Sequence, residues 1–315
     1  LVTGALVALL FYCWGYQIRY DIGVTGLSRP NFWGFYITNF VFWIGISHAG
    51  TLISAILRVT GAEWRRPVTR CAEAITVFAL CVGGLLPLIH LGRPWLFYYM
   101  VPIPSQGLLW PNFNSPLVWD ILAIITYLTG SVLYLALPLL PDFAILRDRS
   151  LRSNPSGFRA RLYSLLAAGW RGTPQQWHSL EQGIRVMAII IIPVAVSVHT
   201  IVSWDFAMTL QPMWHSAIFG PYFVVGAIYS GIAMLLVTMY ILRRGLGLHQ
   251  YLSDAVFNNL SLLFVAVALI WAYFTFAEHL TVFYANQHAE MAVYNERISG
   301  QFAPYFWAMI ALNVG

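Results

Sequence analysis

The stretch AEAITVFALCVGGLLPLIHLGRP, residues 72–94, decides the fold of this chain. It begins with a nearly unbroken apolar run, and about 20 such residues in a helix cross a hydrocarbon layer roughly 30 Å thick. The run then ends in a histidine, a glycine, an arginine and a proline, rather than in the aromatic residues that usually mark a membrane exit. A titratable imidazole and a permanent cation therefore lie at the predicted edge of a bilayer.

Apolar segments of similar length recur along the chain. It is 59% hydrophobic and only 9% charged, whereas a soluble domain carries about 25% charged residues. We therefore predict an all-α fold, a polytopic transmembrane helix bundle. The predicted crossings are Leu1 to Tyr16, Gly34 to Val59, Ala72 to Leu91, Leu117 to Leu140, Ile184 to Trp204, Ala217 to Leu242, Ala255 to Leu280 and an eighth that begins near Pro304.

The basic residues predict the orientation of these crossings. All 17 basic residues are arginines, and most fall on one side. That side holds Arg58, Arg65, Arg66, Arg70, Arg147, Arg149, Arg152, Arg159, Arg161, Arg171, Arg185, Arg243 and Arg244, and the other side holds Arg19, Arg29, Arg93 and Arg297. The positive-inside rule places the arginine-rich side, including a long loop at 142–183, in the cytoplasm. The net charge of +5 is thus an orientation signal, and we expect no nucleic-acid partner.

Cysteines and histidines lack the spacing of metal or haem sites. Cys13, Cys71 and Cys81 include no C-x-x-C pair, so we expect no iron–sulfur cluster and no zinc site held by this chain alone. No predicted crossing carries two well-spaced histidines, which argues against haem. We expect no metal ligands in this chain.

Two short motifs each occur twice. PLVWDILAI at 116–124 resembles PYFWAMIAL at 304–312, and GISHAG at 45–50 resembles GAIYSG at 226–231. We interpret them as two parallel copies of one four-helix bundle. The predicted division is a flanking helix and outer loop at 1–30, a first bundle at 31–205 and a second, truncated bundle at 206–315. The chain is then expected to be part of a longer protein, with a ninth crossing outside it.

Ionisable residues gather at one predicted membrane face. His90 ends the third crossing and Asp120 begins the fourth, so both lie near the outer face at similar depth. His199 and Asp205 approach the same face, as do Glu278 and His279. Each has a structural alternative, such as capping a helix end. Together, His90 and Asp120 favour a proton-handling pair, because an imidazole beside a carboxylate can take up a proton and pass it on.

Other polar residues lie within the crossings. His48 and Ser47 lie deep in the second crossing among small residues that allow close helix contact. They are candidates for a proton relay or for a simple interhelical hydrogen bond, and the two interpretations stay open. Glu73 lies at the cytoplasmic end of the third crossing. The relay candidates are Ser47, His48, Glu73, His199, Asp205, Glu278 and His279.

Longer strings resemble a known family. They are NFWG at 31–34, GISHAGTLIS at 45–54, EWRR at 63–66, AEA at 72–74, HLGRPW at 90–95, WPNF at 110–113, SPLVWD at 115–120 and SVHTIVSWD at 197–205. The chain resembles the NrfD or polysulfide reductase (PsrC) membrane subunits over nearly its whole length. Within that family it is most similar to the ActC-type subunit of bacterial alternative complex III.

The resemblance implies a fold, a site and partners. Such subunits have two four-helix bundles with flanking helices, carry no redox centre and bind a quinol near the outer face of the bacterial inner membrane. Their electrons pass to a periplasmic iron–sulfur subunit and a multihaem c-type cytochrome, in respiratory or photosynthetic chains, beside a homologous second membrane subunit. The family's histidine and aspartate at the quinol pocket fall on His90 and Asp120, and we expect menaquinol as the substrate.

The resulting hypothesis assigns roles to five residues. His90 accepts a quinol hydroxyl proton, and Asp120 orients the imidazole and stabilises its charged form. Arg93 tunes His90 or holds the iron–sulfur partner, while Trp95 and Trp119 wall the quinol ring. Proton translocation through the relay candidates is a further expectation. The alternatives are an anchor subunit without a quinol site of its own and a secondary transporter, whose substrate site would lie near the membrane midplane.

Overall fold

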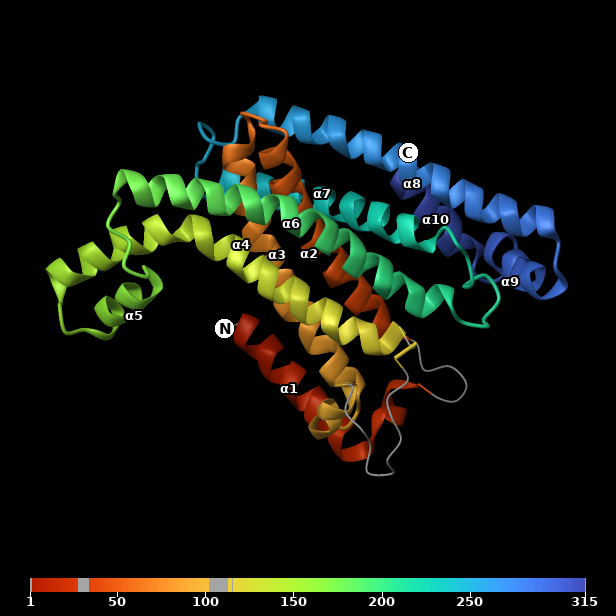
Figure 1. The fold of residues 1–315 in the computed structure, drawn as a ribbon. Helices are drawn as coiled ribbons and strands as arrows, with labels where there is room; N and C mark the ends of the chain where they lie inside the picture. Colours follow the sequence, from red (N-terminus) through yellow and green to blue (C-terminus); the bar gives the residue numbers. More distant parts are fainter. Residues whose placement is uncertain (1, 28–33, 102–112, 115, 315) are drawn as a thin grey trace.

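The protein is described from a computed structural model, which covers residues 2–27, 34–101, 113–114 and 116–314. These residues form helices and no strand, so the predicted all-helical bundle is confirmed (Figure 1). The α-helices are α1 Val2–Tyr20, α2 Phe35–Val59, α3 Arg65–His90, α4 Pro116–Ser153, α5 Phe158–Leu166, α6 Pro174–Ala207, α7 Phe219–Gly245, α8 Asp254–Ala285, α9 His288–Ile298 and α10 Ala303–Val314. Two 3₁₀ helices, η1 Ile22–Thr25 and η2 Pro94–Met100, follow α1 and α3.

Six of the described helices are long and apolar enough to cross a membrane: α2, α3, α4, α6, α7 and α8. The predicted first crossing corresponds to α1, which is not among the six and whose last turns contain Gln17 and Arg19. The predicted eighth corresponds to α10, a shorter apolar helix of 12 residues. The chain is therefore a multi-pass membrane protein.

The segment 142–183, predicted as a long loop, is largely helical. α4 continues to Ser153, α5 follows, and α6 already begins at Pro174. A capping box, in which Thr173 and Gln176 satisfy each other's backbone N–H groups, starts α6 well before the apolar run. Arginine and glutamine are polar, so they interrupt the apolar run from which a crossing is predicted. Both are good helix formers, however, so the helix continues through them. Both helices therefore extend beyond the apolar segments, and α5 lies beyond the end of the bundle (Figure 1).

α2 is the central helix of the bundle and packs on α3, α6 and α7. Small residues permit the close approach. A Cβ added to Gly50 would collide with the Ala72 carbonyl oxygen and Thr76 Oγ1 on α3, and one added to Gly231 on α7 would collide with Ala49. The two matched glycine motifs thus lie face to face, because a Cβ added to Gly45 would also lie 3.6 Å from Ala227 on α7.

Two apolar clusters share α2. One joins α2, α3, α4 and α6 around residues such as Tyr127, Leu80 and Ile191. The other joins α2, α3, α7 and α8 around Ile53, Leu235 and others. The packing brings the start of α2, the end of α3, the start of α4 and the end of α6 together at one end of the bundle. The candidate functional site lies at this end.

Candidate functional site

A cavity of about 460 Å³ lies between the start of α2, the end of α3, the start of α4 and the end of α6. We call it the His90 cavity. Its lining is mostly apolar and consists of Tyr36, Ile37, Phe40, Leu86, Pro87, His90, Leu91, Val118, Asp120, Ile121, Ile124, Val202, Asp205 and Phe206. The structure therefore brings the two predicted catalytic residues, His90 and Asp120, into one cavity.

Three polar atoms of this cavity are buried without a hydrogen-bond partner in the described part of the chain. They are Nδ1 of His90, Oδ1 of Asp120 and Oδ1 of Asp205. Buried polar atoms in folded proteins are nearly always paired, so unpaired ones point to a bound molecule or to a functional role. Three of them in one apolar cavity indicate a site for a ligand that carries hydrogen-bonding groups.

Asp205, predicted only as a relay candidate, lines the His90 cavity together with Asp120. Its carboxyl group, at the end of α6, interacts directly with that of Asp120 on α4. Two carboxyl groups in contact carry a single negative charge more easily than two, and so favour a shared proton. No hydrogen bond or ion pair joins His90 to Asp120 among the described residues, so the expected orienting bond is not formed here.

Tyr36 and Gln17 support His90 and were not foreseen from the sequence. The Tyr36 ring meets the His90 ring edge-on, with centroids 6.1 Å apart. The Tyr36 hydroxyl donates to Gln17 Oε1, and Gln17 Nε2 donates to the carbonyl oxygen of Ile89 at 2.8 Å. Gln17 is only 2% exposed. The signal that the sequence offered was a polar glutamine directly after Tyr16, where the first crossing was predicted to end.

Arg93, Trp95 and Trp119 do not line the His90 cavity in the described chain. After His90, Gly92 adopts a left-handed backbone (φ +68°), and the chain turns into η2. Arg93 instead forms an exposed ion pair of 3.3 Å with Asp21. Trp95 is 56% exposed.

Trp119 also lies outside the lining of the His90 cavity. Its Nε1 donates to the carbonyl oxygen of Phe113 at 2.6 Å, and its ring packs edge-on against Trp204. The aromatic walls of the cavity are instead Tyr36, Phe40 and Phe206.

Deeper in the bundle, two predicted relay histidines meet. The rings of His48 on α2 and His199 on α6 lie 4.7 Å apart between centroids, and both are almost fully buried. His48 Nδ1 lies 2.7 Å from the carbonyl oxygen of Ile44 and must donate to it. His48 Nε2 and His199 Nδ1 are buried and have no partner in the described chain. Each ring thus keeps a nitrogen that can exchange a proton.

A group of hydrogen bonds lies next to this pair along α2. Tyr127 donates to the Ser47 carbonyl oxygen at 2.9 Å, and Thr76 donates to the same oxygen at 2.9 Å. Thr51 bonds Thr76 at 3.1 Å. The Ser47 hydroxyl, predicted as part of the relay, is itself buried without a partner in the described chain.

Glu73 lies one step further along. Ser54 donates to Glu73 Oε1 at 2.7 Å, and Arg58 approaches the same oxygen at 3.9 Å. Glu73 is 2% exposed. A line of buried polar groups therefore runs from the histidine pair to the arginine-rich end of α2.

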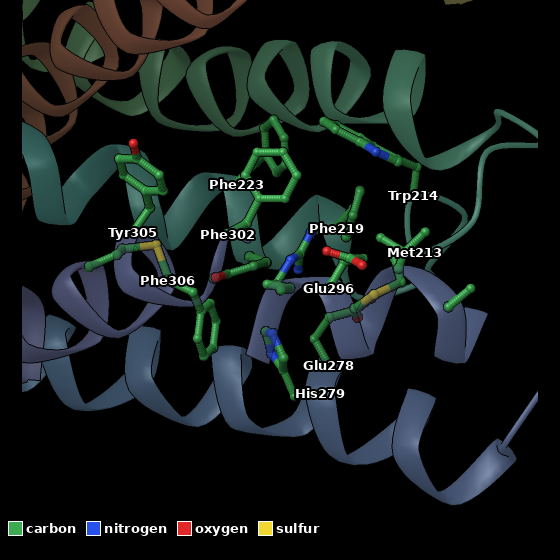
Figure 2. Close-up of a pocket in the computed structure, with 15 residues that line it drawn as sticks. Met213, Trp214, Phe219, Phe223, Glu278, His279, Glu296, Phe302, Tyr305 and Phe306 are labelled. Carbon is green, nitrogen blue, oxygen red and sulfur yellow. The ribbon is translucent and has the colours of Figure 1, made fainter. Parts of the chain in front are cut away.

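Glu278 and His279 lie apart from the His90 cavity. They line a separate cavity of about 910 Å³ between α7, α8, α9 and α10 (Figure 2), which we call the His279 cavity. Among the described residues no group of three or more His, Cys, Asp or Glu side chains is arranged to hold a metal ion. Apart from Arg93, Trp95 and Trp119, the predicted site residues thus fall into two cavities and one buried polar line.

The chain is similar in sequence to subunits of known redox enzymes. The chain is 26% identical to a putative dimethyl sulfoxide reductase membrane subunit of Halobacterium salinarum, over 99% of this chain and 66% of that protein. It is 24% identical to a selenate reductase subunit of Mesobacillus selenatarsenatis, over 90% and 65% of the two chains. It is also 23% identical to the Hdr-like menaquinol oxidoreductase integral membrane subunit of Archaeoglobus fulgidus, over 100% and 68%.

The chain spans about two thirds of the length of these relatives. The family model for polysulphide reductase, NrfD, matches residues 23–314. That match includes all six membrane-crossing helices and every residue of the His90 cavity. This chain therefore belongs to the polysulphide reductase NrfD family.

Proposed function

We propose that this chain is the quinol-binding membrane subunit of an oxidoreductase complex and that quinol is oxidised in the His90 cavity. The observation that supports this most is the trio of unpartnered buried atoms on His90, Asp120 and Asp205 in an otherwise apolar cavity. The names of the relatives agree, since all three are subunits of redox enzymes, two are named as membrane subunits and one is named for menaquinol.

The cavity has the chemistry that a quinol head requires. Small-molecule sites are commonly apolar clefts of about 300–1,000 Å³ with a few convergent polar groups, and the His90 cavity, at about 460 Å³, falls within this range. Phe40 and Phe206 offer apolar faces for the ring. The unpaired nitrogen of His90 and oxygens of Asp120 and Asp205 offer acceptors for two hydroxyl groups.

Oxidation of a quinol releases two protons and two electrons, and each needs an acceptor. In this proposal His90 Nδ1 accepts one hydroxyl proton, and the singly protonated Asp120–Asp205 pair accepts the other and becomes neutral. The two electrons leave to an iron–sulfur partner subunit. His90 is held in place by Tyr36, which Gln17 anchors to the end of α3.

A proton relay through the bundle is the second part of the proposal. His199 precedes Asp205 on α6, and it contacts His48, from which the polar line continues to Glu73 and Arg58. Intramembrane ionisable groups of this kind commonly mark proton pathways. The line supports proton movement between the His90 cavity and the arginine-rich side.

The complex is proposed to be of the alternative complex III type, with this chain as its ActC-type subunit. Its partners would be a periplasmic iron–sulfur subunit, a multihaem c-type cytochrome and a homologous membrane subunit, all in a bacterial inner membrane. The arginines at one end of α2, α3, α4, α6 and α7 support an orientation with that end in the cytoplasm. Such an orientation puts the His90 cavity near the periplasmic face.

The test is quinol oxidation by the purified complex that carries this chain together with its iron–sulfur partner. A His90→Phe variant preserves ring packing against Tyr36 but removes the proton acceptor, and we expect a fall of about 10²–10⁴-fold in kcat. His249→Phe, just after the arginine-rich end of α7, is the matched control. Normal turnover by an assembled His90→Phe complex would refute the assignment and would favour an anchor subunit.

A further inference from the structure

The His279 cavity is as large as a ligand site and does not belong to the proposed quinol chemistry. Figure 2 shows Glu278 and His279 of α8 on one side, Phe219 and Phe223 of α7 opposite, and Phe302, Tyr305 and Phe306 at one end. Its volume is about 910 Å³. It lies on the same predicted outer side as His90, but between different helices.

One buried nitrogen faces this cavity without a partner. His279 Nδ1 lies 2.7 Å from the carbonyl oxygen of Thr275. A carbonyl only accepts, so Nδ1 carries the hydrogen and Nε2 of the neutral ring is an acceptor. Nε2 is buried and has no partner in the described chain. The ring points from α8 into the cavity (Figure 2), so a ligand that donates a hydrogen bond can satisfy it.

The charges around the cavity select the class of ligand. Glu278 and Glu296 contribute two carboxylates, and Arg297 contributes one guanidinium. Glu278 is only 7% exposed, and its Oε2 accepts from Ser216 Oγ at 2.7 Å. Two negative groups face one positive group, so an anionic head such as a lipid phosphate meets net repulsion. A neutral head that carries hydroxyl donors fits.

The walls favour a flat ring over an acyl chain. Seven aromatic side chains line the cavity: Trp214, Phe219, Tyr222, Phe223, Phe302, Tyr305 and Phe306. Phe306 lies next to the unpaired imidazole, with 5.0 Å between the ring centroids of His279 and Phe306. Aromatic side chains bind flat rings through stacked and edge-on contacts. The hydrogen-bond acceptor therefore lies within an aromatic slot.

A second space continues from the same two residues. A neighbouring cavity of about 510 Å³ is also lined by His279 and Phe306. It follows α8 back to Trp271 and α10 on to Val314, and its lining is almost wholly apolar. A hydrocarbon chain attached to a ring at His279 can lie in this space, since burying apolar surface there is favourable.

We propose that the His279 cavity is a second binding site for a hydroxyl-bearing aromatic amphiphile of the quinol class. The hydroxyl group donates to His279 Nε2, the ring lies among the aromatic side chains, and the apolar chain follows α8 and α10. The site is distinct from the His90 cavity and does not depend on turnover there. It gives the subunit two sites for the same class of molecule.

The test uses the full-length protein in quinone-free lipid nanodiscs and a photoreactive azido-naphthoquinol with a short isoprenoid chain. We expect two binding sites per chain, with cross-links on α8 or α10 as well as on α3 or α4. His279→Phe keeps the ring contact with Phe306 but removes the acceptor. It should weaken binding at this site by about tenfold or more and leave the cross-links on α3 and α4 intact.

Ala292→Trp is the second variant, because Ala292 lines the cavity from α9 and a tryptophan would obstruct the space between the aromatic side chains without changing a polar group. It should abolish the α8 and α10 cross-links. His178→Phe, near the start of α6, is the matched control. The proposal is overturned by the absence of α8 and α10 cross-links in the wild-type protein, by α8 and α10 cross-links that persist in both variants, or by displacement with excess anionic phospholipid.

His90→Phe separates this inference from the proposed function. It should remove only the cross-links on α3 and α4. If instead the probe binds α8 and never α3 or α4, the second site stands and the first assignment fails.

Discussion

His48 on α2 stacks on Tyr127 on α4, with ring centroids 4.1 Å apart and ring planes 4° from parallel. The stack fixes the His48 ring while Nδ1 donates to Ile44, which leaves Nε2 directed away from its own helix turn. The His199 ring also contacts the imidazole. The contact therefore joins α2, α4 and α6 at the start of the polar line.

Replacing His48 tests the relay. His48→Phe keeps a ring to stack on Tyr127 but has no nitrogen that can carry a proton. We expect quinol oxidation to continue in a reconstituted complex, while proton release per electron falls to the amount that quinol itself supplies. The measurement is proton release with a pH-sensitive dye in proteoliposomes. Unchanged proton release in an assembled variant would show that His48 only packs.

Tyr127→Phe is the companion to that variant. It keeps the stack but removes the hydrogen bond to the Ser47 carbonyl oxygen. We expect a loss of stability of about 1 kcal/mol, measured as a lower thermal unfolding midpoint. Quinol oxidation should hardly change, because Tyr127 does not line the His90 cavity.

The carboxyl pair gives a third prediction. Asp120→Asn and Asp205→Asn should each lower kcat for quinol oxidation by about 10²–10⁴-fold. Because the two carboxyl groups interact, the double variant should lose much less than the product of the two single losses. Asp148→Asn, which affects an exposed carboxylate paired with Arg147, is the control. Strictly multiplicative losses would show that the pair does not act as one unit.

Tyr36 is predicted to act as a positioning residue. Tyr36→Phe removes the bond to Gln17 but keeps the ring against His90, and we expect kcat to fall by less than about tenfold. Tyr36→Ala also removes a cavity wall, so KM should rise as well. Comparison of kcat and KM for the two variants separates the two roles. Identical kcat and KM in both variants would show that the contact between the Tyr36 and His90 rings does not affect quinol oxidation.

Gly50 tests the tight packing of α2 on α3. A methyl group there would collide with the Ala72 backbone and Thr76, so Gly50→Ala should lower the free energy of unfolding by about 1–3 kcal/mol. Gly84→Ala on α3 is the control, because nothing lies within 4 Å of its added Cβ. The comparison is made by thermal unfolding in detergent. Equal midpoints for both variants would contradict the packing.

Hydropathy and charge predicted which residues share a membrane face, and that was sufficient to place His90 and Asp120 in one cavity. They do not predict the rotation of a helix about its own axis. The Asp120–Asp205 contact, the burial of Gln17 and the outward placement of Arg93 and Trp95 all depend on that rotation. Helix ends were missed for a related reason, since Thr173 begins α6 through a cap that leaves no trace in hydropathy.

The contact between α2 and α7 limits how the protein can move. Gly231 and Ala49 bring the two helix backbones so close that there is no space for one added methyl group. Transporters that alternate access do so by rocking one repeat against the other, and such rocking would have to open this contact. A contact this close favours a rigid frame in which α2 and α7 keep their places.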